Sequence, residues 1–160
     1  MQINPSDIGA LLDRFRADRS RLEGLLAAIP PSRQLDAPHG ERSARNLVAQ
    51  LAAWLNEAND RIPRLLAGAP SVEYDVAAFD AAAAERVADW TPRQALGAFR
   101  RAADRFDVMI AESDPGELIE SDEVVAWLRA AAGCLMDAHI AGLERLVARR
   151  SGGGPRAGAT

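Results

Sequence analysis

Cysteine and histidine are nearly absent from this chain. Its 160 residues hold one cysteine, Cys134, and two histidines, His39 and His139. A single cysteine excludes an internal disulfide and any zinc site built from several cysteines. The chain also lacks the HExxH and CxxC motifs, a Gly-x-Ser-x-Gly elbow and a glycine-rich phosphate loop after a strand. These absences exclude most enzyme classes that a short motif identifies.

Lysine is missing altogether, so all 19 basic residues are arginines, and the formal net charge is −4. The arginines are scattered among acidic residues, whereas a nucleic-acid-binding surface needs a basic stripe. No apolar run of membrane-spanning length is expected, and no signal-peptide core follows Met1. We therefore expect no nucleic-acid partner, no membrane partner and a cytoplasmic location.

A globular, all-α domain is predicted by composition and periodicity together. Hydrophobic residues make up 48% of the chain and charged residues 26%, as in folded domains. Apolar residues recur every three or four positions over 6–29, 43–67, 91–110 and 122–149, which indicates four amphipathic helices. Asp75 opens a shorter, alanine-rich helix between the second and third of them. The expected fold is a four-helix bundle over residues 1–149 with this additional short helix, followed by a disordered tail over 150–160.

Boundary residues support these assignments. Ser43, Asp75 and Thr91 are suited to cap the helices that follow them, and Gln94 completes a capping box with Thr91. Residues 32–42 are predicted to form a loop that carries His39 on the surface, and 114–116 are predicted to form a turn. Cys134 is interpreted as a small buried hydrophobe. The last helix is expected to bury Val124, Trp127, Leu128, Ala131, Leu135, His139, Leu143 and Leu146.

A polar row on the second helix is the main candidate for a site. Asn46, Gln50, Trp54 and Glu57 follow one another at spacings of four, four and three, which places them on one face. One interpretation is a packed tryptophan flanked by polar residues at the edge of the core. The other is the wall of a small pocket between this helix and the last, with His139 facing it, because bundle cores are where such sites are built.

The same residues resemble a known family. Residues 43–54, SARNLVAQLAAW, are similar to the second-helix signature of the DinB-like superfamily, commonly W-S-x-R-D-L-L-A-H-L-A-A-W. Residues 74–80, and the pair Trp127-Leu128 followed by His139, resemble its ClbS/DfsB-type branch. A more distant resemblance is to the N-terminal domain of mycothiol-dependent maleylpyruvate isomerases. The resemblance spans most of residues 7–149 and implies a DinB-like four-helix bundle.

The family's metal site is expected to be degenerate in this chain. The resemblance implies a divalent metal, often nickel or zinc, held by one histidine from the second helix and two from the last. The matching positions are Gln50, Leu135 and His139, and the signature's first tryptophan is replaced by Arg42. Leucine cannot bind a cation, and a glutamine amide is a weak ligand for a transition metal. We therefore predict no metal and no cofactor.

Three classes of function stay open. The first is a non-metal protein that binds a small molecule, or protects against one, in the groove between the second and last helices. The second is a thiol-dependent transferase, isomerase or hydrolase with His139 as general base and Gln50 orienting the substrate. The third is an interaction module, since such bundles often form homodimers. The candidate groove residues are Asn46, Gln50, Trp54, Glu57, Leu135 and His139.

Overall fold

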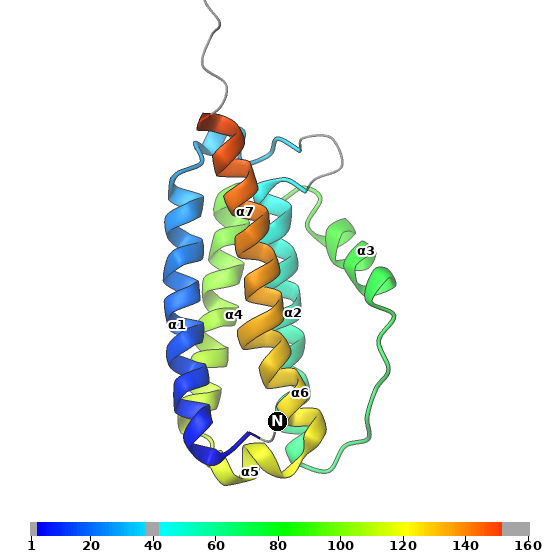
Figure 1. Cartoon of the computed structure of the whole chain (residues 1–160). Helices are drawn as coiled ribbons and strands as arrows, with labels where there is room; N and C mark the ends of the chain where they lie inside the picture. The colour runs from blue at the N-terminus through cyan, green and yellow to red at the C-terminus, as the bar shows by residue number, and fades with distance from the viewer. Residues whose placement is uncertain (1–2, 38–41, 152–160) are drawn as a thin grey trace, which may run out of the picture.

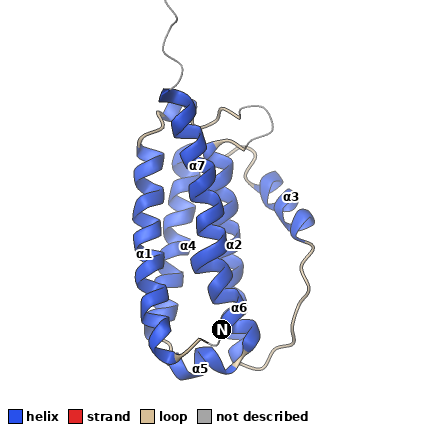
Figure 2. Ribbon diagram, viewed as in Figure 1, coloured by secondary structure: helices blue, strands red, loops and turns tan. Residues whose placement is uncertain are grey.

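The computed structural model describes residues 3–37 and 42–151, and every regular element within them is a helix (Figure 2). No strand occurs in this part of the chain, which confirms the predicted all-α class. His39 and the tail after Ser151 lie outside the described residues, so the predictions made for them stay predictions.

Four long helices form the body of the molecule (Figure 1). They are α1 (Pro5–Ala27), α2 (Ala44–Leu66), α4 (Pro92–Glu112), and a last helix that runs through α6 (Asp122–Arg129), a π-helical segment (Ala130–Cys134) and α7 (Leu135–Ser151). Both α1 and α2 pack against α4 and α7, so α1 and α2 lie on opposite corners of a four-helix bundle. A single 3-10 turn, Pro31–Arg33, follows α1.

The helix α3 (Val76–Arg86) stands beside this bundle, next to α2 and on the side away from α1 (Figure 1). The extended segment that follows α2 leads to it along the edge of the molecule. Gly68, with a φ of 84°, lies in the left-handed region at the end of α2, a conformation that glycine adopts without steric cost. The predicted short helix between the second and third long helices is therefore present.

The predicted helix caps are all present. Ser43 Oγ accepts the backbone N–H of Asn46 at 3.1 Å, and Asp75 Oδ1 accepts a backbone N–H of α3 at 3.0 Å. Thr91 Oγ1 accepts the N–H of Gln94 at 3.2 Å, and the Gln94 side chain accepts the N–H of Thr91 at 2.8 Å. Each cap satisfies donors that a helix start leaves unpaired.

The core is built from aromatic and aliphatic side chains of all four long helices. Phe15 and Phe106 are fully buried, and their ring centroids lie 4.8 Å apart. Alanines on α4 allow α2 to approach closely, and the buried Asn59 of α2 donates to the Ala102 carbonyl at 2.9 Å. The largest fully buried side chains are Phe15, Phe99, Phe106, Leu22, Leu51, Leu55, Ile62, Leu118, Leu128, Met136, Leu143 and Val124.

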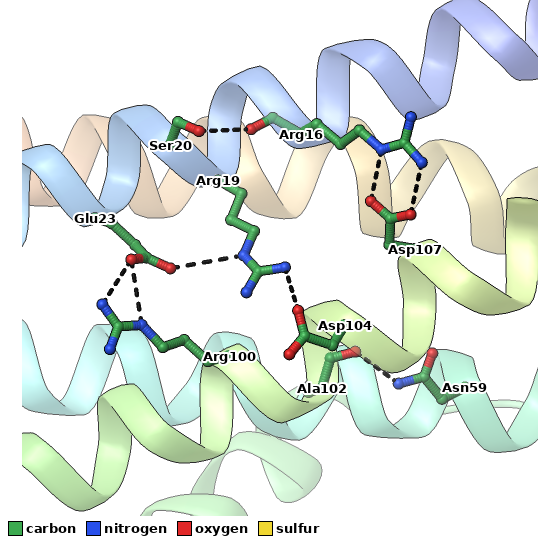
Figure 3. A network of polar contacts seen from close by, with 9 residues as sticks. All are labelled: Arg16, Arg19, Ser20, Glu23, Asn59, Arg100, Ala102, Asp104 and Asp107. Carbon is green, nitrogen blue, oxygen red and sulfur yellow. Dashed lines mark hydrogen bonds and ion pairs between the residues drawn. The ribbon is translucent and has the colours of Figure 1, made fainter.

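Ion pairs tie α1 to its neighbours on the face away from α3. Arg16 bonds Asp107 of α4 at 2.7 Å, and Arg100 of α4 bonds Glu23 at 2.8 Å (Figure 3). The hydrogen bonds from Arg16 to Asp107 and from Arg100 to Glu23 lower the pKa of both carboxyl groups. Exposed pairs of this kind contribute about 0–1 kcal/mol each. They hold α1 in place and are remote from the site described below.

Two elements differ from the sequence-based expectation. Residues 114–116 were predicted as a turn, but they begin a short helix, α5 (Pro115–Glu120), which buries Leu118 completely. The Asp114 carboxylate caps it by accepting the Gly116 N–H at 2.7 Å. An Asp-Pro-Gly sequence is therefore a helix start here, with proline at the first helical position.

The second difference is the π-helical segment inside the last helix. The N–H of Leu135 bonds the carbonyl of Ala130, five residues earlier, so the hydrogen bond spans one residue more than in an α-helix. Met136 and Ile140 consequently enter the core, whereas Leu135 is only half-buried. Trp127 and Leu146 are also half-buried and pack against the core, so their predicted burial is confirmed in part. Cys134 is exposed, so its predicted burial was wrong.

The last helix also corrects the expectation on apolar runs. Among the described residues, one helix, Asp122–Arg149, is long and apolar enough to cross a membrane, judged by length and composition alone. Its most apolar window has a mean hydropathy of 1.3, and 44% of that window is buried inside the bundle. A bundle's core helix has the same length and composition, so this is weak support for a membrane span.

Candidate functional site

A pocket of about 780 Å³ lies on the α3 side of the molecule, between α2, the last helix, and α3 with the segment before it. We call it the side pocket. The residues that line it are Arg42, Leu47, Gln50, Trp54, Val72, Tyr74, Val76, Asp80, Glu123, Ala126, Trp127, Ala130, Leu135, Ala138, His139, Gly142 and Arg145. Its volume falls within the range of about 300–1,000 Å³ that is typical of small-molecule sites.

Small residues on the last helix leave room for this space. Ala126, Ala130, Ala138 and Gly142 all line the side pocket. Gly142 also permits the close approach of α7 to α2, because a Cβ there would lie 3.0 Å from Leu47 Cδ1. The opposite wall is supplied by α3 and the segment before it, including Val76, which is 56% exposed.

Aromatic rings form one wall of the side pocket. The ring centroids of Trp54 and Trp127 lie 6.4 Å apart, and Tyr74 meets Trp127 edge-on at 5.4 Å. Phe79 of α3 also packs against Trp54, with ring centroids 4.0 Å apart. Trp54 Nε1 donates to Asp80 Oδ1 at 2.9 Å, which joins α3 to α2. These contacts fix the rings at separations typical of favourable aromatic pairs.

Tyr74 and Glu57 form a second link across the wall. The Tyr74 hydroxyl donates to Glu57 Oε1, so the phenol proton is held between the two oxygens. Burial, and then this hydrogen bond to an acidic group, raise the pKa of Tyr74 to about 12. Glu57 itself is not among the residues that line the side pocket. It anchors Tyr74, and with it the segment before α3, to α2.

The polar end of the side pocket is formed by Gln50 and His139, together with Arg42, Asp80 and Arg145. His139 is only 6% exposed, and its Nδ1 lies 2.6 Å from the Leu135 carbonyl oxygen. Burial lowers the pKa of His139, and the charge of Arg42 lowers it further. The hydrogen bond to the Leu135 carbonyl and the Asp80 charge act in the opposite direction. The ring is therefore neutral at pH 7.

Two buried polar atoms at this end have no hydrogen-bond partner. They are Nε2 of His139 and Oε1 of Gln50. Buried polar groups in folded proteins are almost always hydrogen-bonded, and the exceptions often mark a site whose partner is a ligand or water. Arg42 lies near them, with its guanidinium 3.7 Å from Asp80. The polar end of the side pocket thus combines two buried polar atoms that lack a hydrogen-bond partner with the positive charge of Arg42, which Asp80 partly neutralises.

The structure brings together four of the six candidate groove residues. Gln50, Trp54, Leu135 and His139 line the side pocket, and Leu135 presents an apolar side chain there. Asn46 does not line it, because its side-chain oxygen accepts two hydrogen bonds from Arg45. Glu57 is likewise outside, behind Tyr74. The remaining wall residues were not predicted as site residues.

Asp80, Tyr74 and Trp127 are the most informative of the residues that were missed. Tyr74 and Asp80 lie within the 74–80 stretch that carries part of the family resemblance. The sequence predicted no site role for that stretch, and it predicted only burial for Trp127. The signal that could have found Tyr74 is its ring, because it is the one aromatic residue between α2 and α3. No comparable signal marks Asp80 or Trp127.

The donor set does not fit a divalent metal. Of the three positions at which the resemblance implies histidine, only His139 carries an imidazole, and Leu135 offers no donor atom at all. Among the residues that the structure describes, no three His, Cys, Asp or Glu side chains are grouped so that they could hold a metal ion. Tight transition-metal sites need three or four such ligands, so we derive no chemistry through a metal here.

Comparisons of the chain with protein-family models, curated proteins and solved structures give no significant match.

Proposed function

We propose that the protein binds a small organic molecule in the side pocket without a metal, as a DinB-like bundle of the ClbS/DfsB type that sequesters or protects against its ligand in the cytoplasm. The observation that carries the proposal is a pocket of about 780 Å³ with a tryptophan-rich wall and two unpartnered buried polar atoms. An apolar cavity with a few convergent polar groups is the usual form of a ligand site.

The position of the tryptophan rings supports a ligand pocket more than a tightly packed core. Trp54 is 7% exposed and Trp127 is half-buried, yet both contribute to the pocket surface. Rings held by hydrogen bonds and ring contacts lose little freedom when a ligand binds, so little binding energy is lost in ordering them. Larger side chains on the last helix would have filled the space, but its lining positions there include Ala126, Ala130, Ala138 and Gly142.

Filling the pocket tests the proposal. Ala138 is exposed on α7 and lines the side pocket, whereas Ala148 is exposed on the same helix outside it. We expect a panel of neutral bicyclic aromatic fragments to change the tryptophan fluorescence of the wild type and of Ala148→Phe, with affinities of about 0.1–1 mM. Ala138→Phe should abolish the response. Equal binding by both variants, or no binding to the wild type, would contradict the proposal.

A thiol-dependent enzyme is the second candidate, and one observation favours it. His139 is neutral and buried, with Nε2 unpartnered, which suits a general base. Nε2 would take the proton of a low-molecular-weight thiol, and the thiolate sulfur would attack an electrophilic carbon of the substrate. The bond from that carbon to its leaving group would break, and the leaving group would depart with the bonding pair and take up the proton from Nε2. Gln50 would orient that substrate. Turnover of electrophiles with mycothiol, bacillithiol or glutathione, lost in a folded His139→Ala variant, is the expected result for this alternative.

A further inference from the structure

The hydrogen-bonding role of each His139 nitrogen follows from its surroundings. Nδ1 lies 2.6 Å from the Leu135 carbonyl oxygen, which can only accept. Nδ1 must therefore carry a proton. In the neutral ring Nε2 then has no proton and is an acceptor. Nε2 lies across the ring from Nδ1 and so points away from the α7 backbone that Nδ1 contacts.

Gln50 adds a second acceptor at the same end of the side pocket. Its Oε1 is buried without a partner, as Nε2 of His139 is. Two unpaired acceptors are complemented by a hydrogen-bond donor and not by a carboxylate or a carbonyl. The missing partner is therefore an N–H or O–H group, and a ligand that provides one recovers hydrogen bonds that the protein alone leaves unmade.

The charges around this end select among donors. Arg42 precedes α2 and Arg145 lies on α7, and both line the side pocket there. Asp80 of α3 is already engaged by Trp54 Nε1 and by Arg42. A cationic ammonium donor would be repelled by the arginines, whereas a neutral hydroxyl is not, and an acidic hydroxyl gains from the nearby positive charge. A neutral, weakly acidic O–H donor fits best.

The rest of the side pocket defines the body that carries this hydroxyl. Trp54 and Trp127 offer ring faces and edges at 6.4 Å from one another, and Leu135 and Leu47 supply aliphatic surface. Aromatic rings pack favourably against such walls in offset or edge-on arrangements. The apolar body is therefore aromatic.

From these observations we propose that the side pocket binds an aromatic alcohol of the phenol class, with its ring beside Trp54 and Trp127 and its hydroxyl donating to Nε2 of His139. This inference rests on the proposed small-molecule-binding function and specifies the ligand's chemistry. Nε2 of His139 and Oε1 of Gln50 are both closed to solvent. The proposed hydroxyl therefore reaches Nε2 only if a side chain of the pocket wall moves, and the half-buried Gln50, with three rotatable bonds, has the freedom to do so.

A matched pair of probes tests the hydroxyl directly. We expect 2-naphthol to bind the wild type roughly 10-fold more tightly than 2-methoxynaphthalene, measured by isothermal titration calorimetry, because the ether has no proton to donate. The cationic 2-(aminomethyl)naphthalene should bind more weakly than 2-naphthol. In His139→Phe the two neutral probes should bind with equal affinity. Ala148→Phe, outside the side pocket, should keep the wild-type preference.

The outcomes separate this inference from the function on which it rests. Equal affinity of 2-naphthol and 2-methoxynaphthalene for the wild type would overturn the phenol assignment and leave small-molecule binding intact, as would tighter binding of the ammonium probe. Failure of all three probes to bind would overturn both.

If His139→Phe does not fold, the wild type at acid pH replaces it. Protonation of Nε2 turns the acceptor into a donor, so the preference for 2-naphthol should fall as the pH drops below the pKa of His139, with the protein still folded by circular dichroism. Arg42 and Asp80 are the charged groups that act on this ring, and Arg42 keeps its charge throughout. A preference unchanged on acidification to the point of unfolding would overturn the assignment.

Discussion

The pKa of Tyr74 can be measured directly, and it reports on the contact that holds the segment before α3 against α2. It is the single tyrosine of the chain, so the near-ultraviolet absorbance of tyrosinate reports on it alone. Burial and the hydrogen bond to Glu57 raise its pKa from 10.0 to about 12. At pH 11 about a tenth of Tyr74 should then be ionised in the folded protein, against about nine-tenths in the unfolded chain. A rapid pH jump followed by absorbance and circular dichroism separates ionisation from alkaline unfolding.

The sign of the linked stability change is fixed by the same pKa. Between pH 10 and about 12 the unfolded tyrosine has lost its proton while the folded one keeps it. The free energy of unfolding therefore falls as the pH rises through this window. Glu57→Gln should lower the pKa of Tyr74 but leave it above 10, because burial is the larger cause. Nine-tenths ionisation at pH 11 before any loss of helical signal would refute the docking of Tyr74 against α2.

Substitutions at three further positions test the framework around the site. Phe106→Ala should lower the free energy of unfolding by about 3–5 kcal/mol in urea denaturation, since its fully buried ring packs on Phe15; a loss below 1 kcal/mol would count against this core. Asp80→Ala removes the acceptor of Trp54 Nε1, so hydrogen exchange of the α3 amides should rise roughly 10-fold or more. Asp80→Asn, which keeps an oxygen for that bond, should change it less. Thr91→Ala should cost about 1 kcal/mol of stability through the lost cap, and no measurable change would show that the cap is dispensable.

The helical framework was predictable because its determinants are local. Apolar residues at three- and four-residue spacing dictate which face of each helix is buried. The side chains of Ser43, Asp75 and Thr91 satisfy backbone donors only a few positions away, so the helix starts can be inferred from sequence alone. Asp114 obeys the same chemistry, and the turn prediction failed there because Asp-Pro-Gly begins a turn and a helix equally well.

The candidate site was predictable only in part, because its determinants are not local. The spacing of Gln50 and Trp54 places them on one face of α2, but the same spacing includes Asn46, which a neighbouring Arg45 holds away from the side pocket. The opposite wall comes from Tyr74 and α3. Tyr74 is positioned by a hydrogen bond to Glu57, 17 residues away in sequence, and α3 by a hydrogen bond between Asp80 and Trp54, 26 residues apart. No periodicity within either segment encodes those contacts.

The π-helical segment explains why the last helix was the least predictable part of the site. A continuous α-helix turns about 100° per residue, so a periodicity carried on from Leu128 assigns Leu135 to the core. The extra residue in Ala130–Cys134 shifts that register, so Met136 and Ile140 enter the core, whereas Leu143 is buried as predicted. Leu135 is thereby released to the side pocket. Such segments recur at functional sites, and the alanine-rich sequence that forms this one carries no distinguishing signal. The direction in which the α7 residues face the pocket is thus set by a backbone feature outside their own pattern.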